Sequence, residues 1–266
     1  MKIVDTHSHY GTVSDTPFMS ASFEEVVEVS RKAGITANVF LGRVESAVDP
    51  SRGGERKNLD IDLIMRINEE VLDRTSREPD CYMCCVLNPL HARSFEQTEE
   101  LLREPGCVGV KILARYHGYD VEVLGDEIFS FLADQDAPAM FHSIENGFDD
   151  PPKIAYLAAK YPTVKACMAH MYSCGAPIAL THARLIRTCA STSLYAGLEH
   201  PYMAFYSIIE HTVREICGSD RLMYGSDLPC HVPAAQLAAI EQADIADADK
   251  ANILFRNAER FFGQEF

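Results

Sequence analysis

Side chains that can bind a metal ion stand at the ends of several apolar segments of this chain. The first segment ends Asp5-Thr6-His7-Ser8-His9, so two histidines are separated by one residue. Because side chains two apart on a β-strand point the same way, His7 and His9 can converge on one ion. Imidazole and carboxylate groups suit Zn²⁺ and its neighbours in the first transition row. This segment therefore indicates part of a metal site.

Three later apolar segments end in the same residue types. Their last residues are His142, His170 and Asp227. A single histidine at such a position is more often a satisfied core or surface residue than a ligand. Three histidines and one carboxylate, with an open position left for water, match a catalytic metal site rather than a closed structural one. The joint placement at four segment ends predicts metal binding.

Short apolar runs recur along the chain, each followed by a loop and an amphipathic stretch. Their starts are about 30 residues apart, which is the length of one βα unit. The runs are Lys2–His9, Ile35–Gly42, Tyr82–Leu87, Val108–Leu113, Ala137–His142, Val164–His170, Ser193–Gly197 and Leu222–Asp227. The stretches expected to be helical are Phe23–Ala33, Leu59–Arg74, Ser94–Arg103, Glu127–Gln135, Pro152–Lys160, Pro177–Cys189, Ala204–Cys217, Pro233–Ala243 and a closing pair over Asp247–Phe262.

Strands that alternate with helices predict an α/β fold with a parallel sheet covered by helices. Eight strands in 266 residues favour a single (β/α)8 TIM-barrel domain over residues 1–266, with closing helices at the C-terminal end. The first strand is not followed by a Gly-x-Gly-x-x-Gly loop, which disfavours an open dinucleotide-binding sheet. In a barrel, catalytic groups lie at the C-terminal ends of the strands, where the histidines and the aspartate stand.

Charge and composition narrow the classes of partner. The chain has 24 Lys and Arg against 39 Asp and Glu, a net charge of −15. This balance disfavours nucleic acid and anionic membrane surfaces as partners. No apolar run approaches the roughly 18 residues that a membrane span needs. We therefore expect a small-molecule substrate, and apolar helix surfaces would allow a homodimer.

The N-terminal segment and the cysteines predict the compartment. The first residues lack the basic and then apolar pattern of a signal peptide. Nine cysteines, an odd number, show no framework spacing, which is typical of reduced thiols. We expect a cytoplasmic protein.

In combination, these motifs resemble the amidohydrolase superfamily, in the amidohydrolase-related (amidohydrolase 2) branch that also contains aminocarboxymuconate-semialdehyde-decarboxylase-like enzymes. The resemblance runs from residue 5 to residue 263. The segments that carry it are Asp5-Thr6-His7-Ser8-His9, Gly109-Val110-Lys111-Ile112, Phe141-His142-Ser143, Ala169-His170-Met171, Gly225-Ser226-Asp227-Leu228-Pro229 and the stretch from Ile253 to Gly263.

The resemblance implies a set of site residues. The ligands that it implies for one divalent ion, usually zinc, are His7, His9, His142 and Asp227. It also implies that His170 either polarises the substrate or completes a second metal site. A second ion would need a carbamylated Lys111. The family often places an aliphatic residue and a histidine after this lysine, whereas Ile112-Leu113 follow here. We therefore expect one metal ion.

Three cationic side chains are candidates for binding a substrate carboxylate. Lys111 stands in an apolar run, where an unpaired ammonium is unfavourable. It either anchors substrate, carries a carbamate, or pairs with a carboxylate such as Glu145. Arg43 and Arg115 follow the second and fourth strands, and each is either a carboxylate fork at the rim or a solvated loop residue. Close after Asp227, the pair Cys230-His231 either lines the pocket or lies in an ordinary loop.

The expected reaction is hydrolysis of an amide, ester or lactone bond in a small, carboxylate-bearing molecule. Asp227 would take the proton of a metal-activated water, and His170 would stabilise the developing charge. A metal-dependent decarboxylase is the alternative, because the same branch contains both reactions and the ligands do not separate them. A third interpretation is a non-catalytic binding scaffold. The complete set of five polar residues argues against that interpretation.

Overall fold

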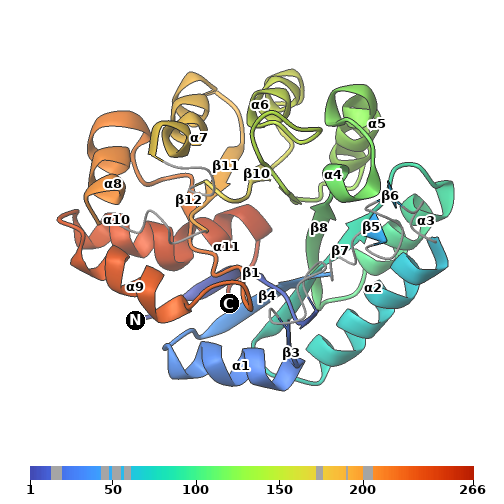
Figure 1. Ribbon diagram of the computed structural model, residues 1–266, viewed down its shortest axis with the longest axis horizontal. Coiled ribbons are helices and arrows are strands. Elements are labelled where there is room, and N and C mark those ends of the chain that lie inside the picture. Colours follow the sequence, from blue (N-terminus) through green and yellow to red (C-terminus); the bar gives the residue numbers. More distant parts are fainter. Residues whose placement is uncertain are drawn as a thin grey trace.

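All eight predicted apolar runs form strands of one parallel sheet, whose strand order follows the sequence. The computed structural model describes residues 1–12, 20–42, 48–49, 55–56, 61–171, 176–189, 191–199 and 206–266. The chain beyond the eighth strand bonds to the first, because Thr6 N donates to Tyr224 O at 3.1 Å and His9 N to Leu228 O at 2.8 Å. The sheet is thereby closed into the predicted (β/α)8 TIM barrel, with helices around it (Figure 1).

The helices and strands alternate as the sequence predicts. The barrel strands are β1 (Val4–Ser8), β4 (Ala37–Leu41), β7 (Cys81–Leu87), β8 (Cys107–Ile112), β9 (Ala139–Phe141), β10 (Ala166–Met168), β11 (Leu194–Gly197) and β12 (Leu222–Met223). The helical elements are α1 (Phe23–Lys32), α2 (Ile61–Ser76), α3 (Ala92–Leu101), α4 (Ala114–His117), α5 (Val121–Asp134), α6 (Pro151–Lys160), α7 (Ala176–Thr188), α8 (Tyr206–His211), the π-helical η3 (Thr212–Cys217), α9 (Pro233–Gln242), α10 (Asp247–Ala251), the π-helical η4 (Asn252–Arg256) and α11 (Asn257–Phe262). Two antiparallel pairs lie outside the barrel sheet: β2 (Gly11–Thr12) with β3 (Ser20–Ala21), and β5 (Val48–Asp49) with β6 (Glu55–Arg56).

Local sequence signals explain how the outer helices begin and end. In α1 the Ser22 side chain accepts from Glu25 N, and the Glu25 side chain accepts from Ser22 N, which forms a capping box. Gly34 follows α1 with a φ of +87°, a conformation that glycine adopts without a steric penalty. In α5 the Asp120 side chain accepts from Glu122 N, so this helix begins six residues before the predicted Glu127.

The apolar core has an outer and an inner part. The outer part lies between the strands and the helices and includes Val110 and Ile112 of β8. The inner part joins alternate strand residues such as Val39 and Leu41 to Phe261 of α11, which covers the barrel interior. Because side chains alternate along a strand, Lys111 between Val110 and Ile112 faces the interior. The barrel thus directs this buried cation toward the candidate site.

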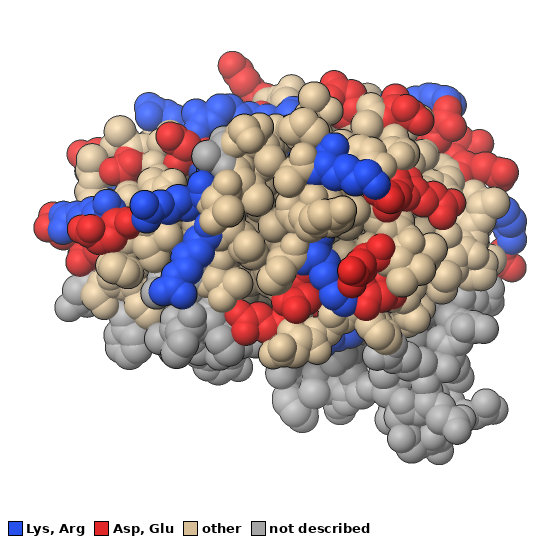
Figure 2. Space-filling view, turned by 90° about the horizontal axis from the view of Figure 1, so that it is seen from above, with Lys and Arg blue, Asp and Glu red and all other residues tan. Residues whose placement is uncertain are grey.

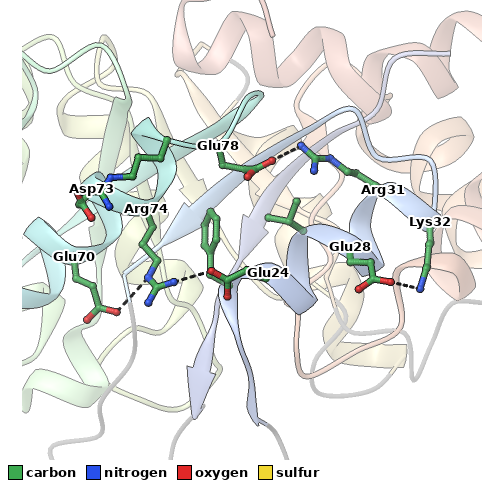
Figure 3. A pocket seen from close by; sticks show the side chains of 11 residues that line it. Glu24, Glu28, Arg31, Lys32, Glu70, Asp73, Arg74 and Glu78 are labelled. Carbon is green, nitrogen blue, oxygen red and sulfur yellow. Dashed lines mark hydrogen bonds and ion pairs between the residues drawn. The ribbon is translucent and has the colours of Figure 1, made fainter.

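The outer surface is charged and carries ion pairs. Acidic and basic side chains are interspersed over the face shown in Figure 2. A groove of about 820 Å³ between α1 and α2 is crossed by pairs such as Arg31 with Glu78 and Arg74 with Glu24, at 2.6 and 2.9 Å (Figure 3). Of the predicted site residues that the structure describes, none lines this groove. Among the described residues, no helix has both the length and the apolar character that crossing a membrane requires.

Candidate active site

Two histidines at the end of the first strand meet an aspartate that follows the last strand of the barrel. His7 lies in β1 and His9 follows it, while Asp227 lies four residues beyond β12. The Nε2 atoms of His7 and His9 are 3.0 Å apart. Asp227 Oδ1 lies 3.5 Å from the first Nε2 and 3.6 Å from the second. All three side chains are buried, so this is a compact interior cluster.

The opposite ring nitrogens of these histidines face acceptors. His9 Nδ1 lies 2.9 Å from the carbonyl oxygen of Leu41, which can only accept, so Nδ1 carries the proton. His7 Nδ1 lies 2.8 Å from Glu199 Oε1 and donates to this oxygen when the carboxylate is ionised. The two Nε2 atoms then turn lone pairs toward each other and toward Asp227 Oδ1. Three converging electron-pair donors fit a divalent cation, and we take this set as the candidate metal centre.

The third predicted histidine ligand is oriented in the same manner. His142 follows β9, and its Nδ1 contacts Asp149 Oδ2, which leaves Nε2 on the other side of the ring. The ring lies edge-on to His170, with the ring centroids 4.7 Å apart. Burial lowers the pKa of His142, although the hydrogen bond to Asp149 opposes this shift. A lowered pKa keeps the imidazole neutral, which is the form that binds metal.

The side chains of His170 and His231 lie near the second carboxylate oxygen of Asp227, Oδ2. The Nε2 atoms of both histidines lie 3.9 Å from Asp227 Oδ2. His7, His170 and Asp227 each offer a ligand atom within 4.8 Å of the others, so His170 also lies within reach of a shared cation. The His231 side chain is nearly buried beside Asp227, and that the pair Cys230-His231 lines the pocket stays a prediction. Asp227 is thus the carboxylate around which the imidazoles gather.

Lys111 brings a positive charge into this cluster. Its Nζ lies 3.4 Å from His7 Nε2, and its side chain is fully buried. Burial lowers the pKa of Lys111, while the carboxylates of Glu199 and Asp227 oppose that shift. The carboxylates that act on it are therefore these two, rather than the Glu145 that the sequence suggested. The role that the sequence suggests for Lys111 stays a prediction.

Burial also shifts the pKa values of Asp5 in β1 and of His9, which follows this strand. Burial lowers the pKa of His9 to about 4, with Asp227 opposing the shift, so the ring is neutral at pH 7. Asp5 is completely buried, and burial raises its pKa to about 6 against the hydrogen bonds that it accepts. Asp5 Oδ1 accepts from His7 N at 3.1 Å and from Ser226 N at 2.8 Å. The Asp5 carboxylate therefore ties the backbone of β1 to the residue before Asp227.

Of the two arginines that the sequence predicts at the rim, the structure describes Arg115. Arg115 lies in the one-turn helix α4, not in the predicted loop, because the four residues Ala114–His117 form a single turn that Gly118 ends with a φ of +80°. Its Nε lies 3.7 Å from Asp149 Oδ1, and about a third of its side chain is exposed. The Arg115 side chain is therefore linked to the carboxylate that holds His142. Arg43 lies outside the described residues.

Sequence reasoning missed the carboxylates that support the histidines. Glu199 follows β11 by two residues, and the rule of polar residues at strand ends could have found it. Asp149 stands seven residues after His142 in a connecting segment, where no spacing rule points to it. Both carboxylates are buried and contact the histidines through space. Their roles depend on three-dimensional proximity, which strand and helix periodicity does not encode.

Comparison with known protein families identifies the family of this chain. Residues 4–264 match the profile of the family described as amidohydrolase. No curated protein matches the chain in sequence.

Solved structures that resemble this fold cover almost all of the chain. A 2,6-dihydroxybenzoate decarboxylase from Rhizobium has a TM-score of 0.77 at 12% identity, with 99% of both chains covered. A dihydroxybenzoic acid decarboxylase from a Polaromonas species, with bound manganese and an inhibitor, has a TM-score of 0.75 at 15% identity, covering 98% of this chain and 97% of that one. An amidohydrolase from Burkholderia multivorans has a TM-score of 0.71 at 13% identity, with 100% of both chains covered. At these identities the likeness establishes the fold alone.

Proposed function

This chain belongs to the amidohydrolase family, and we propose that it is a metal-dependent decarboxylase of a small aromatic acid. The observation that carries the proposal is the convergence of His7 Nε2, His9 Nε2 and Asp227 Oδ1 within 3.6 Å of one another. These atoms, with His142 as a further ligand, would hold one divalent cation. The similar structures include two benzoate decarboxylases, which favours decarboxylation over the hydrolysis that we expected first.

The residues of this chain can be assigned roles in such a reaction. A bound divalent cation would supply positive charge for an oxygen of the substrate. Decarboxylation breaks the bond between the carboxylate carbon and the ring, leaves the electron pair on the ring carbon, and releases CO2. That carbon then needs a proton. Asp227 Oδ2, with His170 Nε2 at 3.9 Å, is the group that we assign to holding and delivering it.

The cationic side chains of the cluster suit an anionic substrate. Lys111 places an ammonium beside the candidate metal ligands, and Arg115 lies next to Asp149 near His142. In a buried site an ammonium attracts a carboxylate far more strongly than it does in water. We propose that Lys111 orients the substrate anion and that Arg115 takes part at the rim. Arg43 remains a sequence-based candidate for the same task.

The cation that we propose is Zn²⁺ or Mn²⁺. Imidazole nitrogens suit zinc, which is the sequence-based prediction, whereas the Polaromonas decarboxylase was solved with manganese. One ion per chain is proposed because Ile112-Leu113 follow Lys111, where the family often has an aliphatic residue and a histidine. Elemental analysis of purified protein, together with activity after reconstitution with each metal, decides between them.

The isotope content of the product tests the proposed reaction. The enzyme would be incubated in D2O with a panel of hydroxybenzoates and in ¹⁸O-water with a panel of esters and lactones. We expect CO2 release and one deuterium at the carbon that carried the carboxylate. Turnover of an ester or lactone with ¹⁸O in the product, and no CO2 from any acid, would contradict decarboxylation.

Hydrolysis stays the second candidate because of one feature of the site. Asp227 Oδ1 faces the metal-binding nitrogens while Oδ2 faces His170, an arrangement that also suits proton removal from a water molecule. The amidohydrolase from Burkholderia multivorans shares the fold. Incorporation of ¹⁸O is the outcome that would favour this reaction.

A further inference from the structure

Glu199 is a buried carboxylate that contacts two histidines of the site at once. It lies two residues beyond β11 and has no exposed surface. Its Oε1 lies 2.8 Å from His7 Nδ1. Its Oε2 accepts the backbone N–H of His170 at 2.7 Å. One side chain therefore reaches both the first and the sixth strand ends.

The surrounding backbone leaves room for this side chain and for little else. A Cβ atom built on Gly197 would lie 2.2 Å from Glu199 Oε1, and one built on Gly225 would lie 2.8 Å from the same oxygen. Side chains at these two positions would displace the carboxylate from His7 and His170. The two glycines form a slot between the ends of β11 and β12. Within that slot, the location of the Glu199 carboxylate is fixed by packing.

We propose that Glu199 is a positioning residue that prepares His7 and His170 for the metal-dependent reaction. By accepting from His7 Nδ1 it fixes the tautomer in which Nε2 carries no proton and offers its lone pair, which is the form that binds a metal ion. By accepting from His170 N it holds a backbone with a φ of +66°, a value rare for residues other than glycine. This inference rests on the proposed metal site but assigns a residue outside it.

The two contacts require two acceptor oxygens, which the ionised Glu199 carboxylate supplies and its amide does not. Glutamine has one acceptor oxygen and one NH2 donor. If its NH2 group faces His7, the ring must carry its proton on Nε2 and loses the metal-binding lone pair. If its NH2 group faces His170 N, two donors oppose each other. Glu199→Gln therefore cannot keep both contacts, although its size and shape are almost unchanged.

Metal affinity tests this role apart from activity. We would measure Mn²⁺ and Zn²⁺ dissociation constants by chelator competition for wild type, Glu199→Gln and the matched control Glu99→Gln. Glu99 lies on the outer face of α3 and is paired with Arg103 at 2.6 Å. Loss of a carboxylate that orients a metal-bound histidine weakens metal affinity by about 10- to 100-fold. We expect that loss for Glu199→Gln and affinity within about twofold of wild type for Glu99→Gln.

The outcomes separate this inference from the proposed function. Failure of wild type to bind any divalent metal would overturn the metal site itself. Wild-type metal binding with unchanged affinity in a folded Glu199→Gln variant, judged by circular dichroism, would overturn the positioning role alone. Should the variant fail to fold, ¹⁵N-histidine NMR of the wild-type protein decides: a proton on His7 Nδ1 supports the role, and a proton on Nε2 contradicts it.

Discussion

The two residues that we assign to proton transfer share an uncommon backbone conformation. Asp227 has a φ of 55° and His170 a φ of 66°. For residues other than glycine, such values cost about 1–2 kcal/mol. Hydrogen bonds hold both in place: Asp227 N donates to His7 O, and His170 N to Glu199, each at 2.7 Å. Strain of this kind concentrates at functional sites, where the surrounding structure fixes it.

Replacing Asp227 by asparagine should remove the proton carrier while keeping the shape of the site. Loss of a general acid or base lowers kcat by about 10²- to 10⁴-fold, and we expect a decrease in this range. Steady-state kinetics on a substrate identified with the panel of acids would measure it, with circular dichroism to verify folding. The matched control is Asp126→Asn. Asp126 lies on α5, where its exposed carboxylate pairs with Lys160 of α6. Full turnover by the metal-loaded Asp227 variant would contradict the assignment.

His117 should make stability depend on pH. Burial lowers its pKa from 6.5 to about 3. Above pH 6.5 the ring is neutral in both the folded and the unfolded chain, so burial of the neutral ring does not lower the free energy of unfolding. As the pH falls below 6.5, only the unfolded chain gains the proton. The free energy of unfolding then decreases by about 1.4 kcal/mol per pH unit until the pH reaches the pKa of the folded state.

The variant His117→Leu cannot take up this proton. Its free energy of unfolding should therefore decrease less steeply between pH 6 and pH 4 than that of wild type, by the same ~1.4 kcal/mol per pH unit. Urea denaturation at several pH values in this range measures both slopes. Equal slopes for the two proteins would show that His117 is accessible to protons in the folded state.

At the scale of elements, the contact between α5 and α6 depends on one glycine. A Cβ on Gly125 would lie 2.2 Å from Leu157 Cδ1 and 3.1 Å from its Cγ. Although alanine favours a helix by about 1 kcal/mol, a clash that involves Cγ cannot be removed by rotating the end of the side chain. We expect Gly125→Ala to lower the free energy of unfolding by about 1–3 kcal/mol, measured by urea denaturation.

A double variant tests the cause. Leu157→Ala alone should also destabilise the protein, because it leaves a cavity beside a buried residue. In Gly125→Ala with Leu157→Ala the new methyl group fills part of that cavity. The combined loss should therefore be smaller than the sum of the single losses. Strict additivity would mean that the two residues do not interact across α5 and α6.

The elements were predictable where a periodic pattern could develop. The eight strand runs are confirmed because each is a continuous apolar segment in a sheet buried on both faces. The one-turn helix α4 and the two-residue strands β2, β3, β5 and β6 are too short to show a period. The predicted helix over Ala204–Cys217 is split into α8 and the π-helical η3. The change to π-helical hydrogen bonding in η3 is not visible in the spacing of the apolar residues.

The site was predictable only in part, for a related reason. Histidines and an aspartate at strand ends could be found because barrel topology brings those ends to one rim. Glu199 and Asp149 act on the far sides of His7 and His142, so their importance lies in contacts between distant segments. No spacing in a single sequence specifies such contacts. The assignment of individual ligands therefore stays a prediction that the variants above test.

At the scale of the whole molecule, the two ends of the chain meet. Lys2 Nζ, near the N-terminus, lies 2.6 Å from Glu259 Oε1 in α11. Asn257 Nδ2, also in α11, donates to Ser219 O and Leu222 O, each at 2.7 Å, and so ties this helix to the eighth strand. The candidate metal centre draws His7 from the first strand and Asp227 from beyond the last. A cation bound there would join segments 220 positions apart in the chain, numbered 7 and 227. Binding should thus stabilise barrel closure.

Metal removal should therefore lower the melting temperature. A ligand that binds only the folded state at 100 times its dissociation constant stabilises it by about 2.7 kcal/mol. For a chain of this size each kcal/mol corresponds to about 2–4 °C, so a chelator should lower Tm by about 5–10 °C. Calorimetry with chelator, followed by addition of Mn²⁺ or Zn²⁺, measures the loss and its recovery. In His7→Ala neither step should change Tm, because the cation has lost a ligand on β1. An equal Tm for wild type before and after chelation would mean that the polar cluster holds the barrel ends together without a metal ion.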